Sequence, residues 1–218
     1  MTPFENRVEA GRMLAESLRD YANRKDVIVL ALPRGGVPLG LELVRVLHAP
    51  LDLMLVRKLG VPGHEELAMG AIASGERVLN DDVVRGCGIT DEALEAVARD
   101  EQAELERRAK RYRGDKPWPK LKDRCVILVD DGIATGATME VAVRAVRQQQ
   151  PASIVLAVPV APPSSLHRFS ALVDRIECLM TPEAFWAIGA WYRDFSQLND
   201  EQVIAMMREA EDLQGGGR

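Results

Sequence analysis

Residues 125–138 read Cys125-Val-Ile-Leu-Val-Asp-Asp-Gly-Ile-Ala-Thr-Gly-Ala-Thr138, and this stretch decides the fold. Its first five residues are apolar, which is typical of a strand buried on both faces of a parallel sheet. Two aspartates follow where that strand should end, and small or hydroxyl-bearing residues then lead into a helical pattern. The stretch therefore predicts a strand, a polar loop and a helix of an α/β protein.

Short apolar runs of the same kind lie on both sides of this stretch. We expect further strands at 26–32, 51–56, 153–159 and 175–180, and helices at 4–22, 38–48, 136–149 and 162–172. Strands that alternate with helices at short spacing predict a mainly parallel sheet flanked by helices on both faces. In such sheets the ligand binds beyond the carboxyl ends of the strands. The residues directly after each apolar run are therefore the candidate site.

The 218 residues are expected to form a single domain over 1–218, with its core at about 26–180. Residues 59–90 are rich in glycine, and we expect loops with a small strand pair there. A charge-rich helix is predicted at about 90–112. Its thin apolar stripe is typical of a solvated outer element, and a lid or a partner surface is the alternative.

The last part of the chain, about 181–211, concentrates aromatic residues and then carries an amphipathic helix from Asp200 onward. Aromatic side chains at 185–195 would stack on a planar ligand, or they form plain core packing. The tail 214–218, with three successive glycines, is expected to be disordered.

Composition excludes several classes of protein. The net charge is −5, so the chain lacks the bulk positive charge of a general nucleic-acid binder. No stretch reaches the roughly 18 apolar residues that a membrane span needs. Three cysteines without metal-ligand spacing and a first segment without a signal pattern favour a cytoplasmic location.

The loop after the central strand suits a phosphorylated sugar. Residues 134–138 combine small side chains with the hydroxyls of Thr135 and Thr138, so backbone N–H groups and a helix N-terminus can surround an anion. The carboxylates of Asp130 and Asp131 are acceptors for the vicinal hydroxyls of a sugar. A solvated Asp-Asp turn that only caps a helix is the simpler alternative.

Two other segments place cations where the first two strands should end. Pro33-Arg-Gly-Gly36 joins a guanidinium to two glycines that allow close approach of an anion. Arg57 and Lys58 follow the second strand and would place two positive charges at the same edge of the sheet. Taken alone, the first segment also fits an ordinary turn and the second a pair of surface charges.

The run VILVDDGIATGAT at 126–138 resembles the diphosphoribosyl-binding motif of type I phosphoribosyltransferases. In that motif, apolar residues precede two acidic residues, three variable ones and Thr-Gly-x-Thr. The resemblance covers about 26–180 and implies that phosphoribosyl diphosphate (PRPP) binds together with Mg²⁺. It implies that Asp130 and Asp131 face the ribose hydroxyls and meet the metal only indirectly. The residues implied to hold the 5′-phosphate are Ala134, Thr135, Gly136, Ala137 and Thr138.

The two cationic segments agree with this resemblance. Arg34, Gly35 and Gly36 match the loop that holds diphosphate in the family, often with unusual backbone geometry. The stretch 56–60, Val-Arg-Lys-Leu-Gly, resembles adenine-type members, and the glycine-rich part after it resembles the family's mobile loop. The catalytic residues implied are Arg34, Arg57, Lys58, Asp130 and Asp131.

The reaction implied is displacement of diphosphate from ribose C1 by an acceptor, usually a base nitrogen. Ala134 stands where enzymes of 6-oxopurines carry Asp, which argues against hypoxanthine or guanine as the acceptor. We find no assignable general base among the three histidines. A PRPP- or nucleotide-binding regulatory protein without transfer is the alternative function, and a hydrolase with the same acidic edge is a third.

The resemblance also sets expectations for the outer parts of the chain. The helix at about 90–112 lies outside the minimal pattern and is read as an insertion. Residues 181–211 are expected to supply a hood over the base. The expected partners are PRPP and a small-molecule acceptor, with neither nucleic acid nor membrane, and a homodimer, common among similar proteins, is left open.

Overall fold

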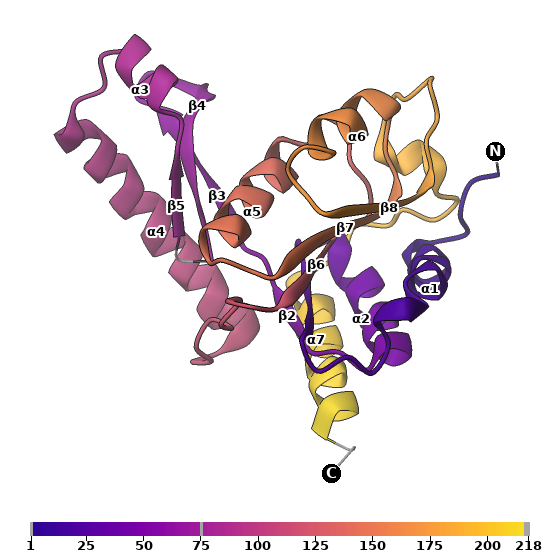
Figure 1. The fold of residues 1–218 in the computed structure, drawn as a ribbon. Helices are drawn as coiled ribbons and strands as arrows, with labels where there is room; N and C mark the ends of the chain where they lie inside the picture. The colour runs from indigo at the N-terminus through magenta and orange to yellow at the C-terminus, as the bar shows by residue number, and fades with distance from the viewer. Residues whose placement is uncertain (1, 75, 216–218) are drawn as a thin grey trace.

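The computed structural model describes residues 2–74 and 76–215 and is built on a five-stranded parallel sheet (Figure 1). The strands lie side by side in the order β2-β1-β6-β7-β8, and every neighbouring pair is parallel. Their bounds are β1 Val27–Ala31, β2 Leu51–Leu53, β6 Cys125–Val129, β7 Ser153–Val160 and β8 Arg175–Met180. The mainly parallel sheet expected from the apolar runs is confirmed.

Helices cover both faces of this sheet, as predicted. The bounds are α1 Arg7–Ser17, α2 Gly36–Leu47, α5 Ala137–Gln148, α6 Pro163–Phe169 and α7 Asp200–Gly215. Because side chains alternate along a strand, Val29 packs with α1, α2 and α7 on one face. Leu30 packs with α5 and α6 on the other. Two short 3₁₀ turns complete this part, η1 Arg19–Tyr21 and η2 Ile188–Trp191.

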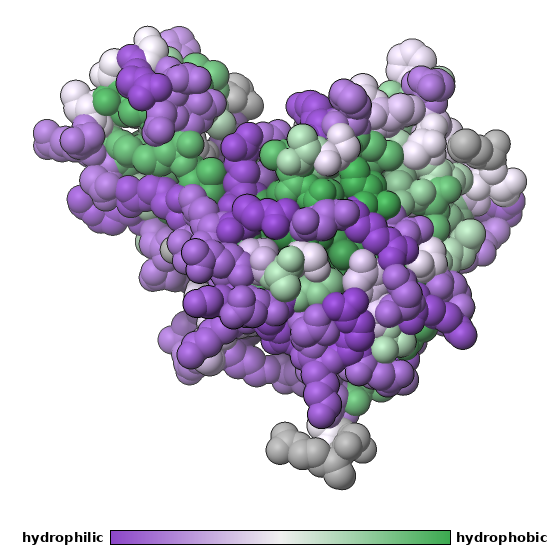
Figure 2. Space-filling view, viewed as in Figure 1, coloured by the Kyte–Doolittle hydropathy of each residue, from purple (hydrophilic) through white to green (hydrophobic). Residues whose placement is uncertain are grey.

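A second sheet stands beside the first, and a notch separates its far end from the rest of the molecule (Figures 1 and 2). It is antiparallel, in the order β3-β4-β5. Two helices follow it, and the longer one is the helix predicted at about 90–112. The bounds are β3 Val56–Val61, β4 His64–Ala73, β5 Glu76–Leu79, α3 Asp81–Gly86 and α4 Asp91–Arg113.

Two expectations from the sequence are wrong in this region. The strand expected at 51–56 ends at Leu53, and Val56 begins a strand of the other sheet. The glycine-rich residues 59–90, expected to form loops with a small strand pair, form most of a three-stranded sheet. Gly60 and Gly70 lie within its strands. Glycine is needed at both positions because a Cβ would come within 2.7 and 2.5 Å, respectively, of backbone oxygens of neighbouring strand residues. These glycines allow close approach of backbones and do not mark loops.

The ends of the chain lie against well-packed elements. Phe4 bridges to Tyr192, so the N-terminal segment lies beside the segment that follows β8. Gln214 and Gly215 belong to α7, and residues 216–218 of the predicted disordered tail lie outside the described residues. No helix in the described part of the chain is long and apolar enough to span a bilayer.

A buried ion pair ties the last turn of α4 to the central sheet. Arg113 is 7% exposed, and its Nε and Nη2 donate to the two carboxylate oxygens of Asp52 on β2, at 2.6 and 2.7 Å. The same guanidinium donates to the carbonyls of Lys116 and Pro117 and lies over the ring of Trp118. This contact therefore fixes where α4 stands relative to the sheet.

Replacing Asp52 by Asn should destabilise the protein by about 3 kcal/mol, because it leaves the Arg113 charge buried without its partner. Chemical denaturation of both proteins measures this difference. Asp26→Asn, which removes an exposed carboxylate from its pair with Arg24, is the matched control and should leave the unfolding midpoint unchanged. Equal effects of the two substitutions would contradict the anchoring role.

Candidate active site

The loop between β6 and α5 forms a cup of unpaired backbone amides. Across the described residues, the N–H groups of 134–138 donate no hydrogen bond to any other group. The loop's carbonyls are held instead by α6: Ser165 Oγ donates to Ala134 O at 2.7 Å, and Arg168 donates to Thr135 O. A trans peptide points its C=O and the next N–H in opposite directions. The amides of Thr135 and Gly136 therefore point away from α6.

The start of α5 completes this cup. Gly136 precedes the helix with φ = 78°, a left-handed conformation that favours glycine, and a Cβ there would come within 2.9 Å of the Phe169 ring. Among the described residues, the hydroxyls of Thr135 and Thr138 take part in no hydrogen bond. Free amides, free hydroxyls and a helix N-terminus together make a site for an anion such as phosphate.

The structure gives the two predicted carboxylates different surroundings. Asp131 is 7% exposed, and its Oδ2 lies 2.8 Å from Nε of Arg7. Asp130 is partly exposed and accepts the backbone N–H of its neighbour at 2.8 Å. No cation in the described part of the chain forms an ion pair with Asp130. Of the two, Asp130 is the acceptor that remains open to a ligand.

Both carboxylates are hard to ionise. Burial raises the pKa of Asp130 well above its usual range, and the charge of Asp131 raises it further. Burial also raises the pKa of Asp131, although the hydrogen bond from Arg7 opposes this. Paired carboxylates with raised pKa values at a sheet edge are typical of functional sites.

Arg7 is a site residue that sequence reasoning missed. It lies 124 residues from Asp131, and nothing in the local pattern of α1 distinguishes it from an ordinary surface arginine. Its guanidinium also donates to the Ser196 carbonyl at 2.9 Å and lies 3.8 Å from the centre of the Phe195 ring. Arg7 thus joins the acidic pair to the segment after β8.

Gly35 and Gly36 form a glycine loop after β1. This loop packs directly against the acidic loop that carries Asp130 and Asp131. A Cβ on Gly35 would overlap Oδ2 of Asp131, and one on Gly36 would lie 2.5 Å from the Val129 carbonyl. The Pro33–Arg34 peptide bond is cis, which is the unusual backbone geometry expected of this loop. The amides of Arg34 and Gly35 have no hydrogen-bond partner within residues 2–74 and 76–215.

The structure brings Arg34 and Arg57 to one cavity but leaves Lys58 outside its lining. Arg34 Nη1 donates to the Leu198 carbonyl at 2.6 Å, and Arg57 Nε donates to Glu101 of α4 at 2.6 Å. Neighbouring residues of a strand point to opposite faces, so the exposed Lys58 lies on the other face of β3. The sequence analysis placed Arg57 and Lys58 at the edge of the central sheet, whereas both residues belong to β3 of the second sheet.

This cavity has a volume of about 360 Å³ and lies between the ends of β1 and β2, the start of β3, and the helices α4 and α7. Thr138 connects it to the amide cup. Its lining holds the five arginines Arg34, Arg57, Arg107, Arg108 and Arg111. The last three are site residues that the sequence reading of α4 as a solvated helix missed. Their spacing at i, i+1 and i+4, on one side of a helix, was the available signal.

The aromatic segment after β8 covers the acidic loop rather than this cavity. Ile188 would meet a Cβ on Gly132, and Tyr192 donates its hydroxyl to the Asp131 carbonyl at 2.6 Å. Phe185 and Trp191 stack with ring centres 6.5 Å apart, and Trp186 is 90% exposed. That this segment forms a hood over a planar base stays a prediction.

These elements define an α/β protein with a candidate ligand site at the carboxyl edge of its parallel sheet. The family model described as "Phosphoribosyl transferase domain" matches residues 4–194, and the chain belongs to this family. The type I phosphoribosyltransferase fold expected from the sequence is confirmed.

Relatives of this chain agree with that assignment. It is 47% identical over 211 residues to two curated Mycobacterium tuberculosis proteins, from strains CDC 1551 / Oshkosh and ATCC 25618 / H37Rv, provisionally named phosphoribosyl transferases. These matches cover 96% of this chain and 47% of each relative, so the chain spans about half the length of the curated relatives it matches. The crystal structure of TT1426 from Thermus thermophilus is similar, with 43% identity and a TM-score of 0.83, covering 96% of this chain and 99% of that one.

Replacing Gly35 by Ala should destabilise the protein by about 1–3 kcal/mol, because the added methyl group overlaps the Asp131 carboxylate. Thermal unfolding followed by circular dichroism measures the change. Gly86→Ala is the control, since a Cβ there meets nothing within 4 Å. Similar melting temperatures for wild type and Gly35→Ala would show that the close approach is not needed.

Replacing Asp130 by Asn should stabilise the protein at neutral pH, because the ionised carboxylate is disfavoured in the fold. The gain should be full above the raised pKa, shrink as the pH falls through it, and vanish below the ordinary pKa of aspartate. A gain of about 1 kcal/mol would raise Tm by about 2–4 °C. Melting curves across pH test this, with the exposed Asp115→Asn as control. A lower Tm for Asp130→Asn at neutral pH would refute it.

Proposed function

We propose that this protein binds PRPP as its Mg²⁺ complex and transfers the 5-phosphoribosyl group to a small-molecule acceptor, releasing diphosphate. One observation carries the proposal: the amides of 134–138 are unpaired within the described residues and lie next to an open carboxylate at the same sheet edge. An anion and a diol are the two groups that such a site binds, and a phosphorylated pentose has both.

Each part of PRPP has a matching group in this proposal. The cup at 134–138 holds the 5′-phosphate, and Asp130 accepts from a ribose hydroxyl. Asp131 keeps Asp130 and the glycine loop in position through its ion pair with Arg7. The free amides of Arg34 and Gly35 meet the diphosphate, with the guanidinium groups of Arg34 and Arg57 as further cations.

The residues present fit a magnesium ion that arrives with its substrate. Among the described residues, no group of three or more His, Cys, Asp or Glu side chains could hold a metal alone. Mg²⁺ keeps several waters and binds through one or two carboxylates together with substrate phosphates. Asp130 is the open carboxylate at this edge, so it would hold the ion, directly or through water. When bound, Mg²⁺ neutralises charge on the departing diphosphate.

Catalysis in this proposal is positioning and electrostatic stabilisation. Breaking the bond between ribose C1 and diphosphate builds positive charge on the sugar and negative charge on the leaving group. Arg34 and Arg57 are fixed by protein partners before the ligand arrives, so they need little reorganisation to face that negative charge. No covalent nucleophile from the protein is required.

Partners and location remain expectations drawn from the sequence. We expect no nucleic acid or membrane among the partners, and a cytoplasmic location.

Replacing Thr138 by Val should weaken Mg²⁺–PRPP binding roughly tenfold or more, because a hydroxyl that would donate to a phosphate is lost. Isothermal titration calorimetry measures the dissociation constant. Thr2→Val, the same change at an exposed position, is the matched control. Chelation of Mg²⁺ should also weaken binding. Wild-type protein that shows neither heat nor competition with PRPP would refute the proposed function.

The measurement that separates the alternatives is diphosphate release with PRPP and a panel of acceptors. Release that depends on one acceptor supports the transferase. Slow release with water alone indicates a hydrolase, and binding without release indicates a regulatory protein.

A further inference from the structure

The inserted helix α4 places a row of cations in the cavity beside the PRPP site. Arg107, Arg108 and Arg111, here called the α4 arginines, line the same cavity as Arg34 and Arg57. Asp200 is the only acidic side chain among the described residues that line it. Four carboxylates of the described residues pair with these five arginines, namely Asp200, Glu101, Glu104 and Glu201, so the cations exceed the anions by one, although the whole chain is acidic.

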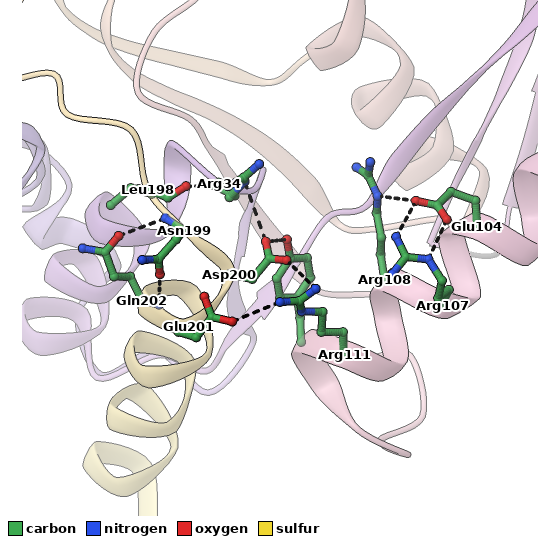
Figure 3. Close-up of polar contacts among 11 residues, drawn as sticks. Arg34, Glu104, Arg107, Arg108, Arg111, Leu198, Asn199, Asp200, Glu201 and Gln202 are labelled. Carbon is green, nitrogen blue, oxygen red and sulfur yellow. Dashed lines mark hydrogen bonds and ion pairs between the residues drawn. The ribbon is translucent and has the colours of Figure 1, made fainter.

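A carboxylate on the helix itself holds two of these arginines in place. Glu104 accepts from Nε and Nη2 of Arg107 at 2.7 and 2.9 Å, and from Nε of Arg108 at 2.9 Å. These hydrogen bonds lower the pKa of Glu104 to about 2, so it stays ionised. In the described part of the chain, Arg108 uses only Nε for these contacts, and its two terminal nitrogens point away from Glu104 (Figure 3).

The cavity already holds one carboxylate of the protein. Asp200 Oδ1 accepts the Tyr112 hydroxyl at 2.5 Å. Its Oδ2 lies 3.0 Å from Nη1 of Arg111 (Figure 3). Arg34 Nε lies 3.8 Å from Oδ1 of Asp200. The Tyr112 hydrogen bond lowers the pKa of Asp200, and Arg111 adds to this effect. The geometry of the cavity thus suits a carboxylate-like anion.

The lining differs from that expected for a neutral base. Pockets for neutral planar ligands are mostly apolar, with few polar groups, whereas guanidinium forks match carboxylates and phosphates. Tyr112 is the only aromatic residue among the described residues of the lining, and its hydroxyl is bonded to Asp200. The phosphates of PRPP already have the amide cup, the glycine loop, Arg34 and Arg57. The α4 arginines therefore exceed what PRPP alone needs.

We propose that the α4 arginines form a subsite for a carboxylate or phosphate group of the acceptor, so that the acceptor is an anionic compound. The proposal rests on the proposed function, because it needs PRPP in the neighbouring site. The competing source of the anion is the leaving diphosphate itself. The two are distinguished by whether the subsite stays open when PRPP is bound.

The test compares Arg108→Gln with Lys110→Gln, which removes an equal charge from an exposed position of the same helix that does not line the cavity. Mg²⁺–PRPP is first titrated into each protein. Inorganic phosphate is then titrated into the PRPP-saturated proteins by calorimetry at low salt. We expect phosphate to bind wild type and Lys110→Gln, and to bind Arg108→Gln at least tenfold more weakly. The fold loss for phosphate should exceed the fold loss for PRPP.

Each other outcome overturns one proposal. If PRPP saturation abolishes phosphate binding, or if Arg108→Gln loses PRPP affinity as strongly as phosphate affinity, the α4 arginines serve the diphosphate. If Arg108→Gln and Lys110→Gln behave alike, there is no subsite. Failure of wild type to bind Mg²⁺–PRPP refutes the proposed function instead. Phosphate is then titrated into the ligand-free proteins, where the same comparison of the two variants decides the subsite.

Discussion

Asp131 joins four segments that lie far apart in the sequence. Its carboxylate oxygens contact Arg7 from the first helix and press against the backbone at Gly35, while its backbone carbonyl accepts from Tyr192. Arg7 in turn lies over Phe195. A buried ion pair of this kind adds little net stability, and removing one partner is costly because the other charge is left buried. The main effect of this pair is to hold the edge of the sheet in one arrangement, on which the glycine loop and the acidic loop both depend.

The acidic and the basic side chains of the site occupy separate places: Asp130 and Asp131 lie in the loop after β6, and the arginines line the neighbouring cavity. Burial raises the pKa of both carboxylates of the acidic pair, whereas five arginines line the neighbouring cavity. This arrangement matches the charge distribution of a magnesium-bound sugar diphosphate, whose ribose end is a donor of hydrogen bonds and whose diphosphate end is anionic. The inserted helix extends the positive side beyond what the central sheet alone supplies.

The sequence predicted the central sheet well because each of its strands is short, apolar and followed by an identifiable turn. It also predicted a loop between the strand at 125–129 and the helix after it, and the binding of a phosphate there stays a prediction. It failed at Gly60 and Gly70, where close packing between strands looks the same in a sequence as a flexible loop. It missed Arg7 and the α4 arginines because their roles depend on contacts across the fold, and in a linear pattern they resemble solvated surface charges. The division of roles between Asp130 and Asp131 could not be read from adjacent identical residues.

The bonds from α6 to the carbonyls of Ala134 and Thr135 have a consequence for affinity. They fix the loop before any ligand is present, so the loss of conformational freedom that accompanies its ordering occurs when the chain folds. In the function we propose, a phosphate that enters meets a preorganised receptor, and little of its interaction energy is used to freeze the backbone. The short helix α6 would then serve as a scaffold for the loop, although it contributes neither hydroxyl nor amide to the ligand.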